Sequence, residues 1–135
     1  MRFSFYFVCF LTFISVFSPV FAQTASIGFS YTILHPENAE NSEVTVSTDT
    51  VKFRLFYVDN VCSGFSYNFV PNQKTLLVQR TSSDSDSCTS EEQILYGVEG
   101  HLTNIPKGKH IFELQTGPSK TIQESIFREV VNIKK

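Results

Sequence analysis

Three histidines, His35, His101 and His110, are the side chains best suited to hold a metal or to act as a general base. The strand alternation described below places His110 on an inward face and His101 on an outward one. Side chains of opposite parity do not readily converge on one ion, so we expect structural or surface histidines. The alternative is a small metal-dependent hydrolase in which His101 or His110 works with Glu99 or Glu113.

Acidic residues gather in and after a serine-rich stretch. Asp84 and Asp86 form a D-x-D pair whose oxygens could hold calcium, but the glycine that an EF-hand loop requires is missing. We therefore expect a solvated acidic loop that, together with Glu91 and Glu92, forms a candidate contact surface. There is also no Gly-x-Ser-x-Gly nucleophile motif. The sequence thus predicts no enzyme, no cofactor and no metal site.

Two cysteines, Cys62 and Cys88, remain once the N-terminal segment containing Cys9 is removed. In an oxidising compartment they allow one intramolecular bridge. Closing a loop of this length stabilises a fold by roughly 3 to 4 kcal/mol in the chain-entropy model, which favours a structural role. A redox or metal-binding pair is the alternative, but the spacing is far from Cys-x-x-Cys.

Residues 1–22 have the order of features typical of a secretory signal. Arg2 precedes a largely apolar run over residues 3–17, Pro19 follows it, and Ala22 provides a small residue at the expected cleavage site. We expect cleavage after Ala22 and a secreted or periplasmic protein without membrane association. An uncleaved anchor is the alternative, because the apolar run is about long enough to span a bilayer.

The charge balance excludes nucleic acid as the expected partner. The full chain carries 11 Lys and Arg against 13 Asp and Glu, and cleavage would remove one of the basic residues. Nucleic-acid affinity depends on clustered basic side chains, and the sequence has no such cluster. Residues 23–135 are long enough for one domain with a single core.

Short runs of alternating apolar and polar residues predict an all-β fold. The expected strands cover residues 27–33, 51–58, 65–69, 74–80, 93–105, 109–115 and 126–133. Turn signals separate them, with a turn at 71–73, another at 106–108, and a break at 117–118. About seven strands at this spacing favour a single antiparallel β-sandwich over residues 23–135.

Aromatic side chains on these strands allow two interpretations. Phe65, Tyr67 and Phe69, with Tyr57 and Tyr96, could line a ligand groove or a carbohydrate platform. Strand alternation instead predicts that most of them lie in the core, with tyrosine hydroxyls at its rim.

The stretch from Leu102 to Gly108, which contains Ile105 and Pro106, resembles a corner of immunoglobulin-like and fibronectin-III-like sandwiches, where an aromatic-bearing strand follows; here that strand carries Phe112. The resemblance implies a secreted module that binds partners or spaces other domains, and it carries no catalytic residue. The chain departs from antibody domains because it has no Trp.

These observations predict a secreted, non-enzymatic binding module for a protein or surface component. Its contact surface would be the exposed strand edges and the Cys62–Cys88 loop. A secreted hydrolase inhibitor is a further alternative, and residues 116–121 would then form its rigid exposed loop.

Overall fold

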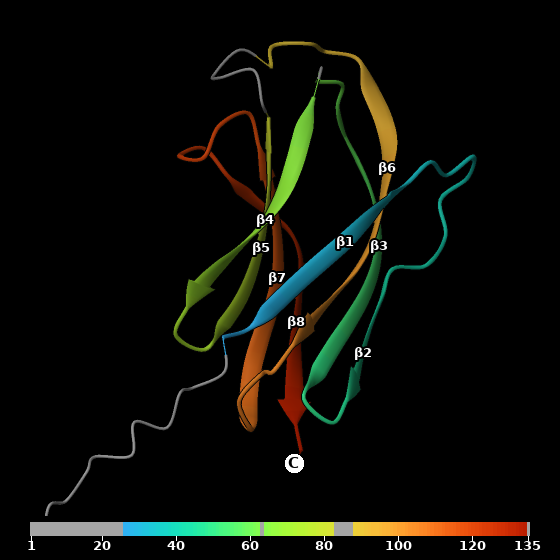
Figure 1. Ribbon diagram of the computed structural model, residues 1–135. Coiled ribbons are helices and arrows are strands. Elements are labelled where there is room, and N and C mark those ends of the chain that lie inside the picture. The colour runs from blue at the N-terminus through green and yellow to red at the C-terminus, as the bar shows by residue number, and fades with distance from the viewer. Residues whose placement is uncertain (1–25, 63, 83–87, 135) are drawn as a thin grey trace, which may run out of the picture.

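A computed structural model describes residues 26–62, 64–82 and 88–134 (Figure 1). These residues form eight β-strands and their connections. The predicted leader and the Asp84/Asp86 pair lie outside these residues. In chain order the strands are β1 (Gly28–Leu34), β2 (Glu43–Ser47), β3 (Thr50–Asn60), β4 (Phe65–Asn72), β5 (Thr75–Ser82), β6 (Gln93–Thr103), β7 (Gly108–Gly117) and β8 (Glu124–Ile133).

The strands form two four-stranded sheets packed as a sandwich. The first sheet, sheet A, has the order β1-β6-β3-β2, and the second, sheet B, has the order β4-β5-β7-β8. Neighbouring strands pair antiparallel except β5 and β7, which run parallel. The predicted all-β sandwich is confirmed, with β2 as the strand that brings the total to eight.

Alternation along the strands builds the core, and β3 illustrates the pattern. Val51, Phe53 and Leu55 are buried while Lys52 and Arg54 between them are exposed, because successive side chains point to opposite faces. Sheet B contributes the buried side chains that face them, and the ring of Phe53 lies 5.0 Å from that of Phe112 in β7. The two sheets therefore share one continuous hydrophobic core.

A glycine in β6 makes this packing possible. A Cβ on Gly100 would lie 2.6 Å from the Phe53 ring and 2.5 Å from the carbonyl oxygen of Ser30. Because glycine has no side chain, the Phe53 ring fits between the sheets. For the same reason β6 can lie close enough to β1 to keep its pairing register.

Two of the predicted turns are confirmed. The chain turns between β4 and β5 at Gln73, with φ of 40°, and between β6 and β7 at Gly108, with φ of 134°. The β2–β3 turn was not predicted, since its left-handed residue is Thr48, with φ of 53°. A β-branched residue seldom adopts that conformation, so Thr48 itself does not indicate a turn.

Two connections cross between the sheets at one end of the sandwich. The chain passes from β3 to β4 and later from β5 to β6 at the end opposite the C-terminus, at the top of Figure 1. These connections contain Cys62 and Cys88, so the fold brings the two cysteines together.

Candidate functional site

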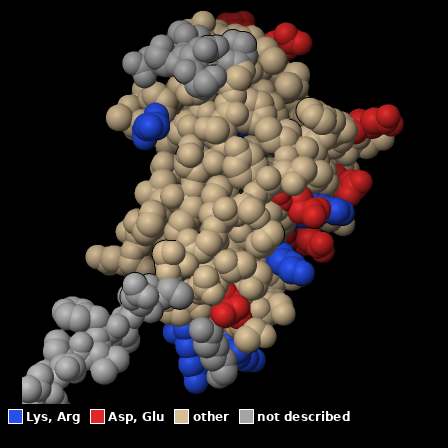
Figure 2. Space-filling view, in the orientation of Figure 1, with Lys and Arg blue, Asp and Glu red and all other residues tan. Residues whose placement is uncertain are grey.

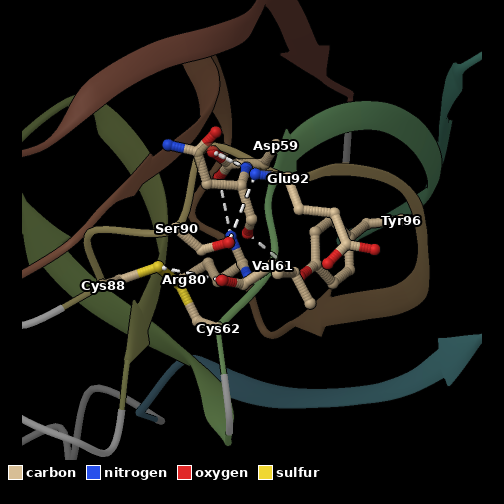
Figure 3. Close-up of a disulfide and its surroundings, with 9 residues drawn as sticks. Asp59, Val61, Cys62, Arg80, Cys88, Ser90, Glu92 and Tyr96 are labelled. Carbon is tan, nitrogen blue, oxygen red and sulfur yellow. Dashed lines mark hydrogen bonds and ion pairs between the residues drawn. A yellow bond between two sulfur atoms is a disulfide. The ribbon is translucent and has the colours of Figure 1, made fainter.

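The predicted disulfide is formed and ties the two crossing connections to each other. The Cα atoms of Cys62 and Cys88 are 5.5 Å apart. Beside the bridge, the backbone N–H of Val61 donates to the carbonyl oxygen of Glu92 at 2.8 Å (Figure 3). The bridge and this bond hold together the end of β3 and the start of β6.

Arg80 lies in the core beside this bridge. Its side chain is 3% exposed, and Nη1 lies 2.6 Å from a carboxylate oxygen of Asp59 on the opposite sheet. The guanidinium carbon lies 4.4 Å from the centre of the Phe65 ring and 4.1 Å from that of Tyr96. Nε and Nη2 are buried and make no hydrogen bond to the part of the chain that the structure describes. Such a cation, held between two rings and one carboxylate, joins the sheets and is closed to solvent.

Further aromatic rings pack beside those that contact Arg80. They lie on the side of the sandwich where β1 and β4 are the edge strands. The hydroxyls of Tyr57 and Tyr67 are hydrogen-bonded to each other. Burial raises the pKa of Tyr67 to about 12, and burial is also the main reason that the pKa of Tyr57 is raised. The predicted interior position of the five aromatic residues is confirmed, since Tyr67 and Tyr96 are buried and Tyr57, Phe65 and Phe69 pack against the core.

His101 and His110 lie on opposite faces, as their parity predicts. His110 is buried, with Nε2 2.8 Å from the carbonyl oxygen of Pro106, whereas His101 is exposed on the outer face of sheet A. Glu113 faces outward from β7, away from His110, and accepts a hydrogen bond from Gln115 at 2.9 Å. Within residues 26–62, 64–82 and 88–134, no three His, Cys, Asp or Glu side chains form a group that could hold a metal.

The two loops singled out in the sequence have different character. Glu91 and Glu92 are exposed just before β6. Within residues 116–121, Ser119 Oγ accepts a hydrogen bond from the backbone N–H of Ile122 at 3.2 Å and lies 2.9 Å from Thr121 Oγ1. The side chain of Ile122 is 61% exposed at this loop.

The polar outer face of sheet A was not predicted from the sequence. Strand register places eight polar side chains there in two rows that run across all four strands. From β1 to β2, the first row contains Ser30, His101, Lys52 and Thr45, and the second contains Thr32, Glu99, Arg54 and Glu43. We call these eight residues the polar rows.

The polar rows line a depression of about 700 Å³. Acidic and basic side chains lie close together on the side of the molecule that carries β2 and β3 (Figure 2). In the depression, Arg54 Nη2 and Nε lie 2.6 and 2.8 Å from one carboxylate oxygen of Glu99. This bond raises the pKa of Arg54, and the charges of Glu40 and Glu43 act in the same direction.

Only half of the polar rows' side chains bond to one another. Besides the Arg54–Glu99 pair, Ser30 Oγ lies 3.1 Å from His101 Nε2 and 3.3 Å from Nδ1. Among the described residues, Lys52 and Glu43 form no ion pair. The free donors and acceptors of this face are therefore open to a ligand.

The outer face of sheet B differs because its polar groups bond to each other. Gln79 donates to Gln115 at 3.0 Å, and Gln115 donates in turn to Glu113. Asn68 donates to Thr81 at 3.2 Å. A face whose amides and carboxylates are already paired offers fewer groups to a partner than the polar rows do.

No protein-family model, curated protein or solved structure matches the chain. Across the part of the chain that the structure describes, no helix is long and apolar enough to span a membrane.

Proposed function

We propose that the protein is an extracytoplasmic, non-enzymatic binding module whose contact surface is the outer face of sheet A. The observation that carries this proposal is the depression lined by the polar rows, where half of the eight side chains make no hydrogen bond or ion pair within the described residues: Thr32, Glu43, Thr45 and Lys52. Its size is in the range of small-molecule sites, which are concave and contain a few polar groups that orient a ligand.

Two features support the location. The signal-like order of residues 1–22 predicts export, and a disulfide such as Cys62–Cys88 persists in oxidising compartments. We also retain the immunoglobulin-like or fibronectin-III-like character of the sandwich as part of this proposal. Its support is the corner before β7, where Ile105 is fully buried and Gly108 turns the chain.

The Ser30–His101 contact is the one observation that favours a hydrolase. Three features weigh against it. Ser30 Oγ lies at similar distances from both ring nitrogens, so it is not aligned with one base. The carboxylate of Glu99 is bonded to Arg54 and does not orient His101. The strand β6 is paired on both sides, so its backbone N–H groups are used in the sheet and are not available for an oxyanion.

Affinity capture tests the proposal. Oxidised protein comprising residues 23–135 is immobilised and exposed to its native medium, and the retained material is compared with that of variants. Arg54→Gln should reduce retention, and the matched variant Arg128→Gln on the outer face of sheet B should not. Equal retention by both variants would contradict the sheet A surface.

The same capture separates the other candidate surfaces. Loss of retention in Glu91→Gln/Glu92→Gln alone would assign the contact to the loop beside the disulfide. Loss in Ile122→Ser alone would favour the inhibitor alternative, because that side chain is the most exposed large apolar group near residues 116–121.

A further inference from the structure

The charges of the polar rows balance one another. Lys52 and Arg54 contribute two positive charges, and Glu43 and Glu99 contribute two negative charges. Cross-strand register places Arg54 between the two carboxylates, with Glu99 on one neighbouring strand and Glu43 on the other. A strongly anionic ligand would meet carboxylates there, and a strongly cationic ligand would meet Lys52 and Arg54. This arrangement complements a ligand without net charge.

The composition of the rows also excludes the usual core of a protein interface. Such cores are rich in aromatic and other apolar side chains that are fully desolvated in the complex. None of the eight side chains in the polar rows is aromatic or aliphatic, apart from the imidazole of His101. Tyr31, Phe53 and Gly100 also line the depression, but the eight side chains of the polar rows provide its hydroxyls, carboxylate oxygens and cationic N–H groups.

We propose that the polar rows bind a neutral oligosaccharide, an inference that rests on the proposed binding function. Each sugar hydroxyl both donates and accepts, so it can bond to a carboxylate such as Glu43 and to a cation such as Lys52. Hydrogen bonds to charged groups are the stronger ones, and here the charged side chains project from three paired strands of one sheet.

The dimensions of the face fit a chain of several sugars. Neighbouring strands lie about 4.8 Å apart, so the rows extend roughly 14 Å from β1 to β2, and the two rows are separated by about 7 Å along the strands. A single monosaccharide would cover only part of this length. The ligand therefore lies across the strands and contacts groups from all four.

Binding to a panel of defined probes tests the proposal. Oxidised protein of residues 23–135 is titrated calorimetrically with neutral tetrasaccharides of glucose, mannose, galactose and N-acetylglucosamine, with a heparin tetrasaccharide, and with spermine. We expect one of the neutral probes to bind more tightly than heparin and spermine. Arg54→Gln and Glu43→Gln should each weaken that binding at least about tenfold, because each removes a charged hydrogen-bonding partner.

Matched variants keep the test specific. Arg128→Gln and Glu129→Gln make the same chemical changes on β8 and should leave the affinity within about twofold of the wild-type value. Arg54 is exposed, and exposed ion pairs contribute little stability, so its variant should fold. A circular dichroism spectrum and the urea midpoint check that it does.

Several outcomes would overturn the proposal. These are no binding of any neutral probe, tighter binding of heparin or spermine, or neutral-probe binding that survives both sheet A substitutions. If no neutral probe binds while Arg54→Gln still abolishes capture from the native medium, the sugar proposal fails and the binding function stands. If neither assay depends on Arg54, both proposals fail.

Discussion

At the scale of single residues, Arg80 and Asp59 make the most unusual contact of the fold. The guanidinium is 3% exposed, whereas the carboxylate is 26% exposed and still reaches water. Removing the counter-charge of a buried ion is costly, because that ion has still lost its hydration and no longer has an opposite charge to compensate for the loss. The two partners should therefore respond differently to substitution.

We expect Asp59→Asn to lower the free energy of unfolding by about 2 to 4 kcal/mol, because it leaves the Arg80 cation buried without a counter-charge. Arg80→Met should cost less, since a flexible apolar side chain can fill the slot between Phe65 and Tyr96 and water can solvate Asp59. Urea denaturation of the oxidised protein measures both values. A larger loss in Arg80→Met than in Asp59→Asn would contradict this account.

The exposed pair of Arg54 and Glu99 provides the control for that measurement. Both side chains are about half exposed, at 47% and 49%. Glu99→Gln should therefore change the free energy of unfolding by no more than about 1 kcal/mol.

The hydrogen-bonded tyrosines predict a loss of stability in alkali. Because burial raises the pKa of Tyr67 to about 12 and also raises that of Tyr57, the folded protein keeps protons that the unfolded chain loses above pH 10. The contribution of these tyrosines is fully present below about pH 10 and falls above it, by up to about 1.4 kcal/mol per pH unit for each tyrosine. Urea titrations between pH 9 and about 12 measure the decline, which should be less steep in Tyr67→Phe. Equal slopes in both proteins would show that these hydroxyls are not the cause.

At the scale of strands, the glycines of β6 face opposite sides of sheet A and predict different tolerances. A Cβ on Gly100 would approach a backbone oxygen of β1 at 2.5 Å, whereas one on Gly97 would meet only side-chain atoms, the nearest being Leu34 Cβ at 2.9 Å. Gly100→Ala should therefore destabilise by about 1 to 3 kcal/mol and by more than Gly97→Ala does. Thermal denaturation of the two variants side by side provides the comparison, and the reverse order would contradict the role of Gly100 in packing Phe53.

The strands that were predicted from sequence are those with strong alternation. In β3 and β5 the apolar positions are buried, as with Val51 and Val78, so the pattern alone identifies them. The short edge strand β2 was missed because it buries little: Val44 is half-buried and Val46 is 39% exposed. An edge strand that packs weakly has a weak hydrophobic pattern.

The candidate site was less predictable than the strands. Alternation assigns outward faces to Glu99, His101 and Arg54, but it does not say which strands are neighbours. The polar rows exist because β6 pairs with both β1 and β3, which are distant from it in sequence. Register between such strands is set by long-range pairing, and a single sequence carries little signal for it.

At the scale of the whole molecule, the Cys62–Cys88 bridge joins the β3–β4 and β5–β6 crossings between the sheets. We expect Cys62→Ala/Cys88→Ala to fold as the same sandwich but to lose roughly 3 to 4 kcal/mol of unfolding free energy, the range for a loop of this length in the chain-entropy model. Urea denaturation gives the value, and the near-ultraviolet circular dichroism spectrum checks that the packing of the aromatic rings is retained. A double variant with the wild-type midpoint would show that the bridge contributes little.

The parallel pairing of β5 with β7 has a consequence for how a newly made chain assembles. The chain is made with its N-terminus first, so β6, which pairs with β1, and β7, which pairs with β5, are made late. Only the local hairpins β2–β3 and β4–β5 can therefore form early. Both cysteines are made before β6. The disulfide between them can therefore join the two hairpins while their edge strands still lack pairing partners. Each sheet becomes complete only when the last third of the polypeptide arrives, and a nascent chain that stalls ahead of β6 holds two tethered hairpins in place of a sandwich.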